Sequence, residues 1–163
     1  MVSTMFLKID GVKGESTDSN HKDEIELMSY SHGVSQPTSA VASTAGGGTS
    51  GRCNHTDLTV TKFLDVSSPV LNGLCCIGKH IDSVVLTLRR ADGDKSIPYM
   101  VYKLKDVVIS SVSVGGSSDQ VPVETLTFNY SKIEWEYSKQ ARAKGGESGK
   151  TNGSWDLSKN ASS

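Results

Sequence analysis

The chain of 163 residues is short of cysteine, of aromatic residues and of long apolar runs. Its three cysteines, Cys53, Cys75 and Cys76, are odd in number and two are adjacent, which excludes a disulfide framework and favours synthesis in a reducing cytoplasm. No apolar run approaches the roughly 20 residues of a membrane helix. The first residues lack the basic region and apolar core of a Sec signal peptide. We therefore expect no membrane insertion and no export by the Sec pathway.

The chain also lacks an excess of charge of either sign. Seventeen Lys and Arg residues face eighteen Asp and Glu residues, for a net charge of -1. This balance gives no electrostatic reason to expect nucleic acid or an anionic membrane as a partner. The length fits a single domain spanning residues 1–163.

What the chain does have is apolar residues at a period of two. Leu58 and Val60 alternate with polar neighbours, and so do Leu126 and Phe128. This alternation is typical of strands with one buried and one wet face. It recurs at short spacing, between Gly-rich turn signals, and predicts an antiparallel barrel or sandwich. The other alternating segments are residues 5–9, 84–88, 99–104 and 107–114.

One segment has helical spacing instead. Ser68 is a candidate N-cap, Pro69 fits the first helical position and Gly78 is a suitable end. The pattern predicts one short helix of about nine residues that turns Leu71, Leu74 and Cys75 towards the core. We interpret Cys75 and Cys76 as small packing residues.

The alternation slips by one residue in two places, and two segments show no periodicity. The slips fall between Leu27 and Met28 and between Tyr130 and Ile133. Each predicts a β-bulge, or else a strand buried on both faces. Residues 35–52, rich in Ser, Thr, Ala and Gly, are expected to form a long extended loop, and residues 139–150 a flexible polar loop.

No motif in the chain carries a complete set of catalytic or ligand-binding groups. Residues 46–53 have the outline of a P-loop, but Arg52 and Cys53 stand where Lys and Ser or Thr are needed, and the segment is not followed by a helical pattern. The four histidines lack metal-ligand spacing. Glu24 with Glu26, and Glu134 with Glu136, are best read as solvated strand faces. We therefore expect no catalytic residue, no cofactor and no metal.

The order of several short motifs resembles the haemolysin-coregulated protein (Hcp) family, the tube subunits of the bacterial type VI secretion system. The resemblance covers nearly the whole chain, although the family often has Trp at the positions of Tyr30 and His32. The matching segments are residues 5–9, 14–16, 25–33 with Ser35 and Gln36, 58–62, 65–69, 78–80, 84–90, 108–113 with Gly115 and Gly116, and the Gly153, Trp155, Leu157 pattern.

The resemblance implies a mainly β fold: a two-sheet antiparallel β-barrel with one short α-helix on its side and a long extended loop. It also implies a structural protein rather than an enzyme, made in the cytoplasm and secreted by the type VI system. Hexameric rings would stack into a tube that carries small effectors in its lumen and works with a spike protein and a sheath.

Two groups of residues are the candidate functional positions under this resemblance. In the strand around residue 30, Met28, Tyr30 and His32 are predicted to point into the core, so that Ser29 and Ser31 face the lumen and its cargo. The extended loop is predicted to contact the next ring through Thr44, Gly46, Gly47, Gly48, Thr49 and Ser50. The alternatives are a monomeric β-barrel binding module and a small hydrolase without a recognisable site.

Overall fold

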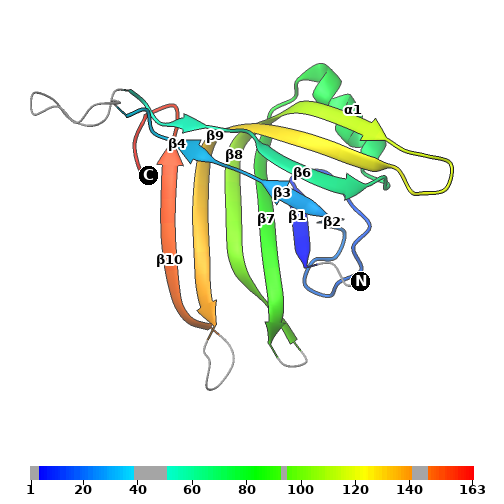
Figure 1. The fold of residues 1–163 in the computed structure, drawn as a ribbon, viewed down its shortest axis with the longest axis horizontal. Helices are drawn as coiled ribbons and strands as arrows, with labels where there is room; N and C mark the ends of the chain where they lie inside the picture. Colours follow the sequence, from blue (N-terminus) through cyan, green and yellow to red (C-terminus); the bar gives the residue numbers. More distant parts are fainter. Residues whose placement is uncertain (1–3, 39–50, 93–94, 141–146) are drawn as a thin grey trace, which may run out of the picture.

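The computed structural model describes residues 4–38, 51–92, 95–140 and 147–163. The predicted fold class is confirmed, because the described chain is mainly β with one short helix (Figure 1). In chain order the elements are β1 (Met5–Ile9), β2 (Ile25–Glu26), β3 (Ser29–Ser31), β4 (Val34–Ser35), β5 (Asn54–His55), β6 (Leu58–Phe63), α1 (Ser68–Ile77), β7 (Ile81–Asp92), β8 (Lys95–Gly115), β9 (Val123–Gln140) and β10 (Glu147–Asp156).

Two long strands, β8 and β9, pass through both halves of a curled sheet (Figure 1). The half that we call sheet 1 contains β3, β6, residues 123–130 of β9 and residues 107–115 of β8. The half that we call sheet 2 contains β2, β1, β7, residues 95–105 of β8, residues 132–140 of β9, and β10. All pairings in both halves are antiparallel, as predicted. The two halves of this one continuous curled sheet correspond to the two sheets predicted from the sequence.

Residues 25–31 link the two ends of the curled sheet. β2 pairs with β1, whereas β3, only two residues further on, pairs with β6. Between them the Leu27 N–H donates to the Met5 carbonyl at 3.0 Å, and the Met28 N–H donates to the Thr61 carbonyl at 2.8 Å. The first phase slip is therefore a change of partner strand and not the predicted bulge, and it joins sheet ends that would otherwise carry unpaired backbone groups.

The second phase slip lies where β8 and β9 pass from sheet 2 to sheet 1. Buried positions change parity in both strands at this point, from Leu104 to Val107 and from Tyr130 to Ile133. Asp106, with φ of 50°, adopts the left-handed conformation there. Because both strands change phase together, their core residues stay on the inner side of the curl. A register shift of the predicted kind does occur in this ladder, but between Ile109 and Ser111.

The helix α1 packs one apolar stripe on the core, as predicted. Leu71 is fully buried, and Leu74 and Cys75 are half-buried against the core cluster. Gly78 ends the helix in the left-handed conformation, with φ of 61°. Two details differ from the prediction: Ser67 rather than Ser68 is the N-cap, and Cys76 is exposed instead of packed.

The structure describes only the ends of the two predicted loops, and strand pairing reaches into both segments. β9 continues to Gln140 and β10 begins at Glu147, so the ends of the 139–150 segment are strands, and residues 141–146 lie outside the description. The 35–52 segment starts within a two-stranded ribbon in which Val34 pairs with His55 and Ser35 with Asn54. The proposed stacking residues, Thr44, Gly46, Gly47, Gly48, Thr49 and Ser50, lie outside the described residues.

Candidate functional site

Two rows of hydroxyl side chains cross the outer face of sheet 1. The strand registers place these residues directly opposite one another, from β3 through β6 and β9 to β8. The first row is Ser29, Thr61, Thr125 and Ser113, and the second row is Ser31, Thr59, Thr127 and Ser111. We call these eight residues the hydroxyl face.

The hydroxyl face follows from alternation along each strand. Thr59 and Thr61 alternate with the fully buried Leu58 and Val60, and the same pattern runs along β9. The Ser residues of the face are exposed and the Thr residues are half-buried between their neighbours. Threonine suits this position because its β-branched side chain favours the strand conformation while its hydroxyl remains accessible to solvent.

The hydroxyls bond mainly to one another. Ser29 Oγ pairs with Thr61 Oγ1, and Ser111 Oγ lies 2.6 Å from Thr127 Oγ1. A carboxylate, Asp57, lies beside the second row, where Ser110 donates to it at 2.6 Å and Asn129 at 3.1 Å. The face itself is uncharged and its groups are partly satisfied internally, so it can offer a ligand only weak, neutral hydrogen bonds of about 0.5–1.5 kcal/mol each.

A buried ion pair lies on the inner face of the same sheet. Lys62 Nζ is 2.6 Å from Glu124 Oε2, and both side chains are fully buried. Lys62 also contacts Asp65 Oδ1 at 2.8 Å, and the Ser68 hydroxyl at the start of α1 donates to Glu124 at 2.6 Å. This network ties β6, β9 and the first turn of α1 together, and it places α1 on the opposite side of sheet 1 from the hydroxyl face.

This ion pair was not predicted from the sequence, although the alternation pattern places both of its residues at inward positions. Lys62 continues the inward parity of Leu58 and Val60, and Glu124 precedes Leu126 on the inward parity of β9. A charged residue at a core position of an alternating strand needs a buried partner, because an unpaired buried charge is costly. Two such residues of opposite sign at inward positions are the sequence signal for a buried pair, and the structure adds that β6 and β9 are neighbours.

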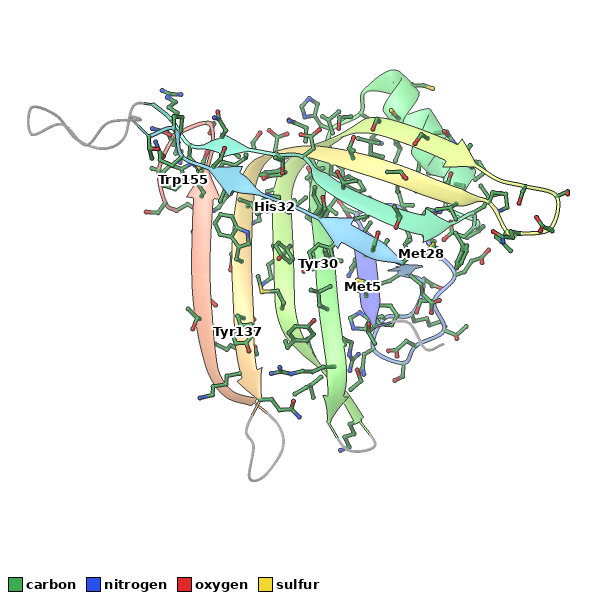
Figure 2. The ribbon with its side chains drawn as sticks, viewed as in Figure 1. Met5, Met28, Tyr30, His32, Tyr137 and Trp155 are labelled. Atoms are coloured by element: carbon green, nitrogen blue, oxygen red, sulfur yellow. The ribbon has the colours of Figure 1, made fainter. Side chains whose placement is uncertain are left out.

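The sequence-predicted residues of β3 are placed largely as expected. Ser29 and Ser31 are exposed on the hydroxyl face, and Tyr30 points to the other side, half-buried against the core (Figure 2). His32, just after β3, is also half-buried. Met28 differs: its residue is 43% exposed, so its predicted core position is wrong. It lies where the chain changes partner strand, and alternation does not apply across that change.

Two further observations concern other kinds of site. Within residues 4–38, 51–92, 95–140 and 147–163, no three His, Cys, Asp or Glu side chains are grouped so as to hold a metal ion. In the same ranges, no helix has the length and apolar character needed to cross a membrane.

Fold and surface together define a mainly β protein with a curled sheet, one flanking helix and an uncharged hydroxyl face. Residues 6–137 match the family model described as type VI secretion system effector, Hcp. The chain belongs to the Hcp family.

Relatives and solved structures resemble the chain along its length. Protein hcp1 of Pseudomonas aeruginosa is 37% identical over 161 residues, covering 98% of both chains. A solved structure of a type six secretion system protein has a TM-score of 0.91 at 30% identity, over 99% of this chain and 100% of that one. Hcp1 from Salmonella typhimurium has a TM-score of 0.80 at 30% identity, over the whole of both chains.

Proposed function

We propose that this protein is a structural, non-enzymatic subunit of the type VI secretion tube, forming hexameric rings that stack and are themselves secreted. Its membership of the Hcp family carries this proposal. The partners are other copies of the chain, the spike protein, the sheath and small effector proteins. The protein is made in the bacterial cytoplasm and leaves by the type VI system.

Two strand edges support assembly with other copies. In the described ladders, β10 pairs with β9 alone, apart from a bridge between its last residue, Asp156, and Ala161, and residues 108–115 of β8 likewise pair with β9 alone. An unpaired edge is a template for pairing with another chain, and a closed ring hides it. These edges belong to different strands, so contacts between them are heterologous, the type of contact that closes into rings.

The hydroxyl face is proposed to line the lumen, with Ser29 and Ser31 among the residues that meet cargo. An uncharged surface with weak hydrogen bonds suits a channel that holds different proteins and releases them, because no single contact is strong. Repetition around a ring adds many weak contacts to one centrally held cargo. With this face inward, α1 lies on the outside of the ring.

The mass of the purified protein tests the assembly. A ring of six 17.4 kDa chains has a mass of about 104 kDa. Light scattering at micromolar concentration is expected to give this value. A single species at the monomer mass excludes the ring and favours the monomeric binding module.

The segment that contains Thr44 to Ser50 is proposed to contact the next ring of the stack. Deletion of these residues is expected to leave the mass of the ring unchanged and to reduce both tube formation and secretion. Deletion of a similar length from residues 141–146 is the matched control. Normal secretion of the first deletion variant excludes the stacking role.

A further inference from the structure

Two histidines flank the β4–β5 ribbon and converge on one tyrosine. His32 lies two residues before β4, and His55 is the last residue of β5. His32 Nε2 is 2.5 Å from the Tyr130 Oη, and His55 Nδ1 is 3.2 Å from the same oxygen. Tyr130 belongs to β9, so this oxygen connects both strands of the ribbon, at the end where Val34 pairs with His55, to the body of the curled sheet.

The Tyr130 hydroxyl has one proton to donate and can accept two hydrogen bonds. When it donates to the Thr56 carbonyl at 3.2 Å, each imidazole donates an N–H to the phenol oxygen. The direction of each histidine bond depends on the tautomer of the ring. In either neutral tautomer an imidazole has one nitrogen without a proton, so each ring can take one up.

The surroundings do not favour two charged imidazoles. The His32 and His55 ring centroids are 6.3 Å apart, and both rings lie against Trp135 at 6.3 Å. The other titratable groups facing the pair are Tyr102 on β8, which contacts His32 at 6.1 Å between centroids, and Tyr130 itself. Tyr30 on β3 contacts Tyr102, with 5.5 Å between the ring centroids.

The nearby acidic side chain, Asp57, influences the pKa of Tyr130 and already accepts hydrogen bonds from other residues. Burial raises the pKa of the Tyr130 hydroxyl, and the charge of the nearby Asp57 carboxylate raises it further. The Asp57 carboxylate accepts hydrogen bonds from Ser110 and Asn129. Neither histidine has a carboxylate hydrogen-bond partner among the described residues, which distinguishes them from His21 and His80.

We propose that His32, Tyr130 and His55 form an acid-sensitive clamp that holds the β4–β5 ribbon on the sheet and releases it when the imidazoles are protonated. Two cations at this separation repel each other within a partly buried aromatic environment. Among the described residues the ribbon has two residue pairs of its own, the bonds between Thr56 and Gly33, and one bond from the Gln36 side chain to the Gly51 carbonyl at 2.6 Å. It therefore depends on the clamp more than a long strand would.

The direction of the pH effect follows from the two pKa values. Burial, and then the charge of His55, lower the pKa of His32, and burial lowers the pKa of His55. The clamped state therefore binds fewer protons than the released state. Its stability is fully present above about pH 6.5, the ordinary histidine value, and is lost as pH falls below it.

Hydrogen exchange tests the clamp directly. Exchange is measured by mass spectrometry at pH 7.5 and 5.5, corrected for the intrinsic rate, on peptides covering residues 30–36 and 53–58. Each proton taken up on release changes protection by up to about tenfold per pH unit. We expect protection of both peptides to fall at least about fivefold at pH 5.5, while a peptide from β9 keeps its protection.

Variants assign the effect to the two histidines. In the double variant His32→Gln, His55→Gln, each glutamine has a side-chain N–H that can donate to Tyr130. Glutamine does not titrate, so the pH response is expected to disappear. His80→Gln, at an exposed histidine, is the matched control and should respond as the parent does. Tyr130→Phe removes the shared acceptor and should leave the ribbon weakly protected at both pH values.

Two results would overturn the clamp: equal protection of the parent protein at both pH values, or a pH response that survives in the double glutamine variant. The clamp does not require the ring, but the ribbon leads into the segment proposed to contact the next ring, so any effect of the clamp on stacking would rest on the proposed function. Light scattering of the same samples separates the two ideas. A monomeric protein with a pH-sensitive ribbon would support the clamp and contradict the proposed ring. A ring whose ribbon does not respond to pH would support the ring and contradict the clamp.

Discussion

The two faces of sheet 1 are built from the same strands and differ in almost every physical property. The inner face presents Leu58, Val60, Leu126 and Phe128, all fully buried, with the Lys62–Glu124 pair among them. The outer face presents eight hydroxyl residues and no charge within its two rows. Neighbouring residues of one strand thus differ in role. The inner residues contribute most of the stability, and the outer residues are available for contacts with other molecules.

The largest expected effect concerns the buried ion pair. Lys62→Met leaves Glu124 as an unpaired buried charge, and we expect a loss of about 3–5 kcal/mol in the free energy of unfolding, measured by urea denaturation. The double variant Lys62→Met, Glu124→Leu removes both charges and should recover most of this loss. A single variant that costs less than about 1 kcal/mol would contradict a paired, desolvated Lys62.

Neighbouring substitutions on β9 compare the two faces more finely. Leu126→Ala removes a fully buried side chain and is expected to cost about 2–5 kcal/mol. Thr125→Ala, one residue earlier on the hydroxyl face, is expected to cost less than about 1 kcal/mol. Both values come from the same denaturation measurement, and equal costs would mean that the faces are not distinct in energy.

The smallest effect on stability is expected at Ser31. Ser31→Gln changes an exposed side chain, so the free energy of unfolding should change by no more than about 0.5 kcal/mol and the mass of the ring should be unchanged. Under the proposed lumen role, the larger side chain alters the cargo surface, and the abundance of the cognate effector in the producing cell should fall. Unchanged effector abundance with an intact ring assigns Ser31 to an ordinary exposed position.

Much of this arrangement could be predicted from the sequence because alternation is a local signal. The parity of Leu58 and Val60 assigns Thr59 and Thr61 to the other face without any knowledge of partners. The same argument correctly predicts that Ser29 and Ser31 point away from the core. The helix was also predictable, since Pro69 and Gly78 mark its ends.

What could not be predicted depends on partners distant in the sequence. The change of partner strand at Leu27 and Met28 looks like a bulge in the sequence, because both shift the alternation by one residue. The convergence of His32 and His55 on Tyr130 joins residues 98 and 75 positions apart. Local patterns contain no information on such contacts.

The proposal that the hydroxyl face lines the lumen is tested most directly by locating that face in the assembled ring. Cys53, Cys75 and Cys76 are replaced by alanine, one new cysteine is introduced and labelled with maleimide-gold, and the rings are viewed end-on by electron microscopy. Ser31→Cys should place gold in the central hole, and Val70→Cys, exposed on α1, should place it at the outer rim. Gold from Ser31→Cys at the rim, or gold from Val70→Cys in the hole, would contradict the account.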